Sequence, residues 1–543
     1  MGAAAAMAAP MSWRRLVYSV YSPALAGAFT RISDRLFRAR DRRGGSSVLL
    51  LAPLLAKAAP APENAAAARC APRSLHAHFR WMAEHVPAFR VNGARVRVLA
   101  SPDQFYQTLK ARVRTAKRRV VLASLYLGTG QLEQDLVDCV QEALERSQEN
   151  SHTPDLKVSV LLDYTRGSRG QVNSRTMLLP LLRRFTSQMR VSLYHTPDLR
   201  GLLRLLVPQR FNETIGVQHI KVYLFDDSFI ISGANLSDSY FTNRQDRYVL
   251  LEDCGELADF FSELVEAVGD VSLQLGPDDS VAMRDGMVHP YKGDRQDFSA
   301  AASKRIMEVV DVARARQQLL LGRHHQNSEE EEEEDTWVFP LVQMKPLGIQ
   351  VDEQVTQRLL RDADQDSTVY LTSGYFNLTR AYMRLVLRAG AGYRILTASP
   401  EVNGFFGAKG VAGAIPDAYT HIAGQFYEHV RRLGQQGRIR LHEYHRPEWT
   451  FHAKGLWYYL HGQDRPCLTL IGSPNFGYRS VHRDLEAQVA IVTENERLQD
   501  QLREEQEMLY QSSSEVSGST FKQPDRHVKL WVKLVTPFIK NFF

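Results

Sequence analysis

Cysteine is scarce in this chain of 543 residues. The four cysteines, Cys70, Cys139, Cys254 and Cys467, lie far apart and include no Cys-x-x-Cys pair. This spacing excludes a zinc cluster and a disulfide framework, so we expect a reducing or redox-indifferent compartment. No set of metal ligands is predicted elsewhere in the sequence.

The sequence also lacks an apolar run of the roughly 20 residues that span a bilayer. The apolar stretch at 48–56 contains Pro53 and stops at Lys57, so any membrane contact is expected to be peripheral. The net charge of +6 fits an anionic partner, which can be a nucleic acid, a phosphorylated metabolite or an acidic membrane surface. The length favours several domains, or one large enzyme built from two similar halves.

Acidic residues are rare near the N-terminus. Residues 1–62 carry nine basic side chains against two acidic ones, with abundant alanine and serine. Trp13, Leu16 and Val20 recur at helical spacing beside arginines, as an import-type amphipathic helix requires. We therefore expect residues 1–75 to be a transit peptide and flexible leader; a disordered basic arm is the alternative.

Two segments of the chain repeat each other in order and in chemistry. Residues 118–140 and 367–387 each hold a β-branched apolar run that ends in a serine, then a tyrosine two residues later and a helix-periodic segment. Further strand-like runs follow in the same order, at 157–167 and 190–197 in the first copy and at 393–404 and 438–447 in the second. Strands that alternate with helices predict an α/β fold with mixed sheets, built twice as α/β/α halves.

This repeat sets the domain organisation that we expect. The first half is placed at 76–290 and the second at 346–515. Residues 291–345 are interpreted as a linker, because the seven consecutive acids at 329–335 repel one another and stay solvated. A cation-binding segment is the alternative for the acidic run.

The remaining residues, 516–543, form a tail that mixes lysines with aromatic and aliphatic side chains. Val528, Trp531, Val532 and Val535 fall on one helical face. Two interpretations stay open: a helix anchored on anionic lipid, or a terminal helix docked on the protein core.

A histidine followed two residues later by a lysine stands at the corresponding place in each half. The first half reads His219, Lys221, Asp226 and Asn235, and the second reads His452, Lys454, Ser473 and Asn475. One such match is weak, but two copies in register with a duplicated fold are specific.

The chemistry of these side chains favours phosphoryl transfer at one site shared by both halves. Residues two apart on a strand project from the same face, so each histidine is expected to point with its lysine. The lysines, with Asn235, Asn475 and Ser473, are candidates to bind or orient the phosphate. One neutral imidazole attacks phosphorus and the other protonates the leaving group. Asp246 and Glu486, each eleven residues after the asparagine of its half, are placed to orient the imidazoles.

The paired motifs resemble those of the phospholipase D superfamily, whose HxKxxxxD and GSxN motifs occur twice in one chain. The resemblance covers most of residues 85–500 and implies catalytic roles for His219, Lys221, Asp226, His452 and Lys454. The second motif departs at Tyr459, where the family has aspartate, and for this reason we expect His219 to be the nucleophile and His452 the acid. In the first half Ser232 and Gly233 replace the usual Gly-Ser.

A narrower resemblance is carried by HIKVYLFDD, SGANLSDSYFTNRQDRY, HAKGLWYY and GSPNFGYRS, together with the arginine-rich leader. These segments are similar to a family of mitochondrial phosphatidyltransferases. The resemblance implies transfer of a phosphatidyl group from CDP-diacylglycerol to glycerol 3-phosphate, with release of CMP, on the route to cardiolipin.

The same resemblance implies a peripheral protein on the matrix side of the mitochondrial inner membrane. Its partners would be the two substrates and an anionic membrane surface, and no nucleic acid is expected. No cofactor is required by the superfamily chemistry, because lysines carry the charge; divalent cations are expected at most to modulate activity.

A weaker signal lies in the loop 123–130. Ser124, Tyr126, Gly128 and Gly130 follow a predicted strand, and two glycines there suggest a contact with the phosphates of a nucleotide. The loop lacks the GK[ST] ending of a P-loop, so a turn that lines the site is the other interpretation.

Two other functions stay open from the sequence. A hydrolase of the same superfamily, acting on a phospholipid or a nucleic acid, would use these residues with water as the acceptor. A scaffold whose site has decayed is the third, as Tyr459 hints, although both histidines, both lysines and both asparagines are present.

Overall fold

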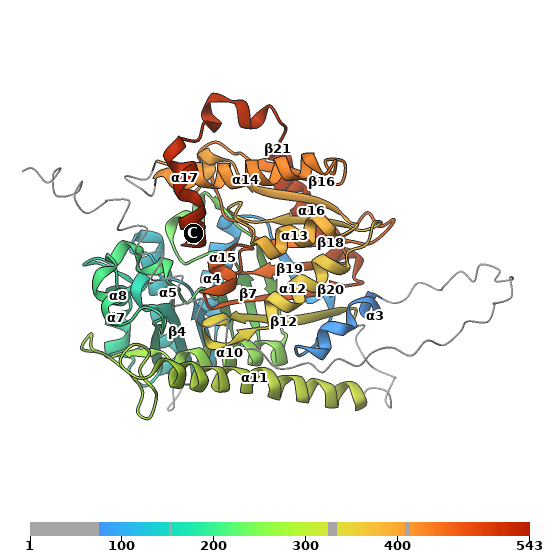
Figure 1. Ribbon diagram of the computed structural model, residues 1–543. Coiled ribbons are helices and arrows are strands. Elements are labelled where there is room, and N and C mark those ends of the chain that lie inside the picture. The colour runs from blue at the N-terminus through green and yellow to red at the C-terminus, as the bar shows by residue number, and fades with distance from the viewer. Residues whose placement is uncertain (1–74, 151–154, 324–333, 408–412, 543) are drawn as a thin grey trace, which may run out of the picture. The chain divides into compact units, whose positions relative to one another are not determined.

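The computed structural model describes residues 75–150, 155–323, 334–407 and 413–542. In these ranges the longer strands form two large mixed sheets, one for each half of the chain (Figure 1). The transit peptide and leader predicted for 1–75 lie outside the described residues except for Leu75, and so does most of the acidic run, at 329–333.

The first sheet runs in the order β11-β10-β5-β4-β3-β6-β7-β9-β2. Its strands are β2 (Val96–Leu99), β3 (Arg119–Ala123), β4 (Lys157–Asp163), β5 (Met189–Tyr194), β6 (Val222–Phe225), β7 (Ser228–Ser232), β9 (Tyr248–Leu251), β10 (Leu273–Leu275) and β11 (Val281–Ala282).

The second sheet runs in the order β1-β12-β20-β19-β18-β14-β15-β16-β21, with β13 paired to β12. Its strands are β1 (Phe89–Val91), β12 (Thr336–Met344), β13 (Ile349–Gln350), β14 (Thr368–Thr372), β15 (Gly392–Ala398), β16 (Ile439–Tyr444), β18 (Gly455–Tyr459), β19 (Leu468–Gly472), β20 (Glu486–Thr493) and β21 (Ser513–Glu515).

The two sheets share one strand order, which confirms the predicted duplication. Strands β3, β4 and β5 pair in parallel, as do β14, β15 and β16. Beside each parallel set come antiparallel strands, β6, β7 and β9 in the first sheet and β18, β19 and β20 in the second. Parallel neighbours require a crossover, and the helices α5 (Gln131–Asn150) and α13 (Arg380–Arg388) supply it where the sequence predicts them.

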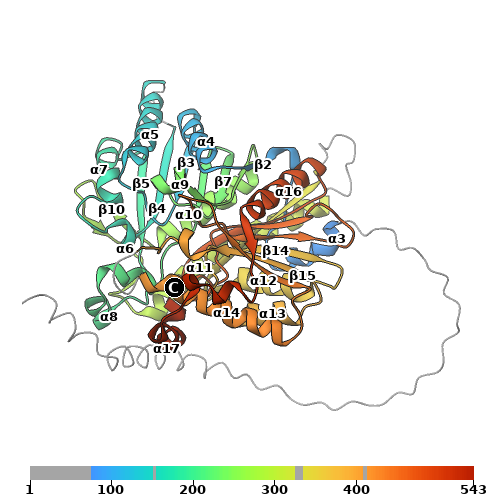
Figure 2. The ribbon, with the colours of Figure 1, turned by 90° about the horizontal axis from the view of Figure 1, so that it is seen from above.

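Helices cover both outer faces and fill the space between the sheets. One apolar core joins the outer face of the first sheet to α4 (Pro102–Thr115), α5 and α7 (Ser174–Arg184), and a second joins the other sheet to α12 (Val351–Asp362), α13 and α14 (Ile415–Arg432). A third core contains residues of both sheets with α10 (Gly255–Asp270), α11 (Arg295–Arg323) and α16 (Glu496–Gln511). Figure 2 shows the two outer helical layers on opposite sides. The halves therefore share an interior.

The structure corrects the predicted domain boundaries. The predicted linker, 291–345, contains the 29-residue helix α11, whose Phe298 and Ile306 are buried in the shared core, and all of the buried strand β12. The predicted first half, 76–290, contributes β1 to the second sheet, where it pairs with β12. A polar composition suggested a linker here, but a helix needs only one apolar stripe to pack.

The C-terminal tail supports part of each interpretation that the sequence left open. Its helix α17 (Leu530–Ile539) docks through Val528 and Val532 on Ala418 of α14. The sequence predicts that Trp531 shares one face with Val528 and Val532. In the structure Trp531 does not lie on that buried face, because it is 47% exposed. The solvent side of α17 carries the exposed side chains Leu530, Trp531, Leu534 and Phe538.

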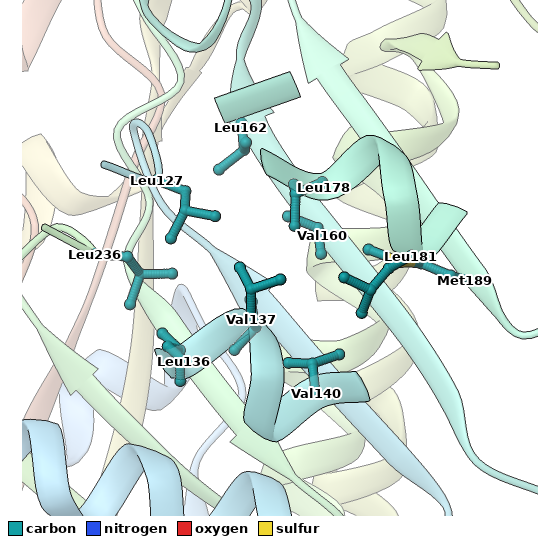
Figure 3. A pocket seen from close by; sticks show the side chains of 11 residues that line it. Leu127, Leu136, Val137, Val140, Val160, Leu162, Leu178, Leu181, Met189 and Leu236 are labelled. Carbon is teal, nitrogen blue, oxygen red and sulfur yellow. The ribbon is translucent and has the colours of Figure 1, made fainter. Parts of the chain in front are cut away.

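An apolar cavity of about 20 Å³ lies in the outer core of the first half. Figure 3 shows aliphatic side chains of β4, α5 and α7 pointing toward it. A space of this size holds about one water molecule, and its lining offers no polar partner. It is a packing gap rather than a ligand site. None of the described helices combines the length and the apolarity needed to cross a membrane.

Candidate active site

Both histidines of the repeated motif are fixed by backbone pairing between the halves. The His219 N–H donates to the carbonyl oxygen of Leu485 at 2.8 Å, and the His452 N–H donates to that of Gln245 at 2.8 Å. Beside His452, β8 (Arg244–Gln245) pairs in parallel with β17 (Thr450–Phe451). Each acceptor residue immediately precedes an acid, so each histidine is set opposite a carboxylate of the other half.

The imidazole and carboxylate pairs cross between the halves. His219 Nδ1 lies 2.8 Å from Glu486 Oε2, and His452 Nδ1 lies 2.6 Å from Asp246 Oδ2. Both carboxylates are buried. A carboxylate that accepts from Nδ1–H fixes the tautomer, which leaves Nε2 with a lone pair for chemistry. The structure thus brings together four residues that the sequence singled out.

The two lysines belong to the same buried cluster as the imidazoles. The sequence predicts that each His-x-Lys segment lies in a strand, and the structure does not bear this out. Strand β6 begins one residue after Lys221 and β18 one residue after Lys454, so neither His-x-Lys segment is inside a strand. Each Nζ donates to the carbonyl oxygen of its own histidine, His219 or His452, at 2.7 Å. Both ammonium groups are completely buried, and a buried cation is costly unless anionic groups face it.

Burial dominates the electrostatics of this cluster. It lowers the pKa of His219 well below its ordinary value, and Lys221 adds to the effect. It lowers the pKa of His452 to about 3, again with help from a lysine, Lys454. Both imidazoles are therefore neutral near pH 7, as a nucleophile or a general base must be.

The acids and lysines respond to one another. Burial raises the pKa of Glu486, although Lys221 opposes the shift. Burial also acts to raise the pKa of Asp246, but Lys454 and His452 outweigh it, and the pKa falls below its ordinary value. Burial lowers the pKa of both lysines, opposed by Glu486 at Lys221 and by Asp246 at Lys454. The groups behave as one electrostatic unit.

The two asparagines present unsatisfied polar atoms. Asn235 and Asn475 each have a side-chain oxygen that is buried and has no hydrogen-bond partner among the described residues. Such atoms are rare in folded proteins, and a polar substrate group or a bound water molecule can satisfy them. A substrate group that donates a hydrogen bond, or a water molecule bound beside the substrate, would satisfy these two oxygens.

Ser473 is used differently from the prediction that it binds phosphate. Its hydroxyl donates to the carbonyl oxygen of Ala487 and accepts from the N–H of the same residue, so it supports the strand that carries Glu486. Ser232 donates to the matching carbonyl, that of Arg247, which follows Asp246. The exchange of Gly-Ser for Ser-Gly in the first half therefore preserves this hydrogen bond.

Asp226, predicted to be catalytic, is not part of the cluster. It occupies the tight turn between β6 and β7 with φ of 51°, roughly 16 Å along the strand from Lys221. Its carboxylate accepts from the backbone N–H groups of Lys117, Arg118 and Arg119. The aspartate of the motif thus ties the turn to the start of β3, far from the imidazoles.

Tyr459, at the corresponding end of β18, is equally remote from the chemistry. Its hydroxyl donates to Gln506 Oε1 at 2.9 Å, and its ring packs against Tyr370. The replacement of the motif's aspartate by tyrosine therefore affects how the end of β18 is held. It gives no reason to assign unequal roles to His219 and His452.

A different asymmetry distinguishes the two imidazoles. The Tyr240 hydroxyl lies 3.3 Å from His452 Nε2 and 3.1 Å from the Asn235 amide nitrogen. In the ranges that the structure describes, no hydrogen bond engages His219 Nε2. Tyr240 is not among the residues predicted from the sequence. It stands five residues after Asn235, just as Ser480, a partner of Glu486, stands five after Asn475.

The glycine loop is committed to the protein itself. The Gly128 N–H donates to the carbonyl oxygen of Leu236, and the Gly130 N–H donates to the Glu133 carboxylate. The Ser124 hydroxyl donates to the carbonyl of Tyr126. Both glycine N–H groups therefore already have acceptors within the protein, and contact with a nucleotide phosphate stays a prediction.

Tyr126 is the member of that loop with a polar group on the site side. Its hydroxyl contacts that of Ser237 at 3.1 Å, and Ser237 stands two residues after Asn235.

In the described ranges, no group of three or more His, Cys, Asp or Glu side chains has the arrangement to hold a metal ion.

Comparison with known proteins agrees with this geometry, although no protein-family model matches the chain. The chain is 63% identical, over 100% of both proteins, to the mitochondrial CDP-diacylglycerol-glycerol-3-phosphate 3-phosphatidyltransferase of Homo sapiens. It is 61% identical to the protein of the same name from Gallus gallus, over 98% of each.

A solved structure shows the fold. The crystal structure of phosphatidylserine synthase from Haemophilus influenzae matches with a TM-score of 0.63 at 20% identity, covering 86% of this chain and 99% of that chain. This likeness confirms the predicted α/β fold. The chain belongs to the CDP-diacylglycerol-glycerol-3-phosphate 3-phosphatidyltransferase family.

Proposed function

We propose that this protein transfers the phosphatidyl group of CDP-diacylglycerol to glycerol 3-phosphate, which gives phosphatidylglycerophosphate and CMP. The observation that carries the proposal is the crossed arrangement, in which two neutral imidazoles, each held by a buried carboxylate, share one cluster with two buried lysines. The names of the relatives support the two substrates.

In the first step His219 attacks the phosphorus of the phosphatidyl group through Nε2. Glu486 accepts the hydrogen bond from Nδ1–H and stabilises the positive charge that the ring gains. Lys221 and Lys454 stabilise the negative charge that builds on the phosphate oxygens. The bond from phosphorus to the CMP oxygen breaks, and CMP is a good leaving group because the second pKa of a phosphate monoester is about 6.

In the second step the free primary hydroxyl of glycerol 3-phosphate attacks the same phosphorus. His452 is neutral in the free protein, and it accepts the hydroxyl proton while Asp246 stabilises the imidazolium that forms. The phosphorus–nitrogen bond breaks, His219 is restored as a neutral imidazole, and His452 then releases the proton to water. The acceptor enters on the face from which CMP departed.

This mechanism uses no cofactor. The two buried lysines place positive charge at the phosphate, a task that divalent ions perform in many phosphoryl-transfer enzymes. Divalent cations would then modulate activity only through the charge of the substrate or the packing of the lipid.

The function is tested with labelled CDP-diacylglycerol and purified protein, with and without glycerol 3-phosphate. CMP release that depends on the acceptor is the expected result. Release at the same rate without the acceptor would identify a hydrolase of the same superfamily, and no release from well-folded protein would identify a scaffold.

For its place in the cell, we propose a peripheral position on the matrix side of the mitochondrial inner membrane. The human and chicken relatives are mitochondrial by name. The apolar surface of α8 (Gly201–Leu206) and α17 supports contact with lipid, and both helices lie along one edge of the molecule in Figure 2. We call this the apolar edge; its exposed apolar residues are Leu202, Leu205, Leu206, Leu530, Trp531, Leu534 and Phe538.

The apolar edge also carries positive charge, which favours binding to anionic lipid, and it lies close to the active site. Arg204, Lys529 and Lys533 are exposed on the same two helical segments. Helix α8 leads through a short 3-10 helix to His219. At the end of the tail, the ring of Phe542 lies 4.2 Å from the guanidinium carbon of Arg483, two residues before Leu485, which pairs with His219. A lipid substrate would therefore leave the membrane next to the cluster.

Replacing Leu534 and Phe538 together with serine is expected to weaken binding to vesicles about 100-fold, because two large apolar side chains no longer enter the lipid interface. Sedimentation with phosphatidylcholine vesicles, with and without an anionic lipid, measures the effect. Leu319→Ser is the control, since Leu319 is 68% exposed near the C-terminal end of α11, whereas the contacts of this helix toward α8 are made by its first residue, Arg295. Equal binding by the double variant and the control would refute a membrane role for α17.

A further inference from the structure

Three arginines lie beside the histidine and carboxylate pairs, and two of them are neutralised. Arg247 is fully buried and donates to both oxygens of Glu505, at 3.0 and 2.8 Å. Arg479 donates to Asp484 at 2.9 Å. Among the residues that the structure describes, no carboxylate forms an ion pair with Arg244, and the groups that act on its pKa besides burial are the neutral phenols of tyrosines.

Arg244 is nevertheless held in a fixed position. Its Nε donates to the Thr450 hydroxyl at 2.9 Å, and its guanidinium carbon lies 4.7 Å from the ring centre of Tyr240. A Cβ atom on Gly404 would lie 3.6 Å from Arg244 Nη2 and 3.2 Å from the Tyr375 hydroxyl. One guanidinium and two tyrosine hydroxyls therefore border the same small space.

The distances from the two tyrosines to His452 show where this space lies relative to the reacting groups. The ring of Tyr240 lies 5.1 Å from that of His452, with its hydroxyl 3.3 Å from Nε2. The ring of Tyr375 lies 6.5 Å from that of His452. Arg244 also lies close enough to act electrostatically on His452 and Lys454. The unneutralised charge is thus on the His452 side of the cluster.

We propose that Arg244, with the hydroxyls of Tyr240 and Tyr375, forms a second anion site that binds a phosphomonoester on the His452 side of the reacting phosphorus. A partly desolvated cation without a counter-ion is unfavourable in the free protein, and an anionic ligand removes that cost. The planar guanidinium offers paired N–H groups that match two phosphate oxygens. This inference rests on the proposed function, which supplies two phosphomonoesters.

Each of those two phosphomonoesters reaches the His452 side, and the assays below decide which of them the site binds. CMP carries its phosphate away from the His452 side in the first step, and glycerol 3-phosphate brings its own phosphate to that side in the second. The lysines remain at the reacting phosphorus throughout. A site for the phosphate of the acceptor would explain how an alcohol is preferred to water, which carries no such group.

The test compares Arg244→Gln and Arg244→Lys with the native full-length protein. Arg446→Gln is the matched control, because Arg446 is an exposed arginine in the segment before β17 and stacks on Trp449 at 3.6 Å. We expect kcat/KM for glycerol 3-phosphate to fall about 100-fold in Arg244→Gln, to recover in part in Arg244→Lys and to stay unchanged in the control.

A second assay separates the two sources of phosphate. Exchange of labelled CMP into CDP-diacylglycerol, without acceptor, reports the first step alone. An unchanged exchange rate in Arg244→Gln assigns the site to the acceptor phosphate, and an equal loss in both assays assigns it to the phosphate of CMP. Losses in Arg244→Gln no larger than those in Arg446→Gln would overturn the proposal.

Thermal unfolding with inorganic phosphate, CMP or glycerol 3-phosphate tests binding without turnover. Because Arg244 lacks a counter-ion, Arg244→Gln should unfold at or above the native midpoint, and the rise in midpoint caused by these ligands should disappear. A lower midpoint with the ligand-induced rise intact would show a structural role and overturn the anion site. Ligand-induced stabilisation that depends on Arg244, in a protein that releases no CMP, would instead refute the proposed function and leave the site standing.

Discussion

His219→Ala is expected to lower phosphatidyl transfer at least about 10⁴-fold, because the attacking nitrogen is removed. The ring lies opposite Glu486, and no hydrogen bond engages its Nε2 in the described part of the chain. Transfer is measured as acceptor-dependent CMP release by the purified variant. Activity within tenfold of the native level would show that another group attacks phosphorus.

Asp226→Asn is the matched control for that variant, since Asp226 belongs to the same sequence motif. Its carboxylate supports three backbone N–H groups in a turn remote from the imidazoles. The control should keep its turnover per folded molecule while its free energy of unfolding falls by about 2 kcal/mol. A loss of turnover equal to that of His219→Ala would return Asp226 to the chemistry.

His452→Ala is expected to stop the reaction halfway. The first step needs little acid catalysis because CMP leaves readily, but the second step loses the base that activates the hydroxyl. Overall transfer should fall about 10³-fold, while one equivalent of CMP is released and labelled lipid phosphate stays on the protein.

The trapped intermediate has a chemical signature. A phosphorus–nitrogen bond is labile in acid and stable in base, and peptide mapping should place the label on His219. The double variant His219→Ala with His452→Ala should carry no label. Label on His452 in the single variant His219→Ala would exchange the two roles.

The sequence predicts those features that local pattern determines. The repeated strand and helix segments and the mixed sheets appear in the structure at the predicted places, whereas the two His-x-Lys segments precede strands instead of lying within them. The eleven-residue spacing from each asparagine also predicts the orienting acids, Asp246 and Glu486, which the structure places against the imidazoles. Each of these signals resides in a few consecutive residues.

The features that escaped prediction depend on contacts between distant segments. A motif lists Asp226 beside Lys221, but it does not say that a strand carries the two to opposite ends. The polar residues of 291–335 concealed a packed helix, and the predicted linker also took in the apolar strand β12, the second strand from an edge of its sheet. Arg244 lies within the run SGANLSDSYFTNRQDRY, which predicts no role for it, because the absence of a counter-ion is visible only when every neighbouring carboxylate is placed.

The crossed pairing has a consequence for truncated products of the gene. His219 relies on an acid 267 positions downstream, and His452 relies on one 206 positions upstream. A premature stop codon after residue 323 would preserve the whole first motif and one complete sheet, yet the surviving imidazole would have no carboxylate. Such a product would be catalytically silent however well it folded, and only the uninterrupted polypeptide makes an enzyme.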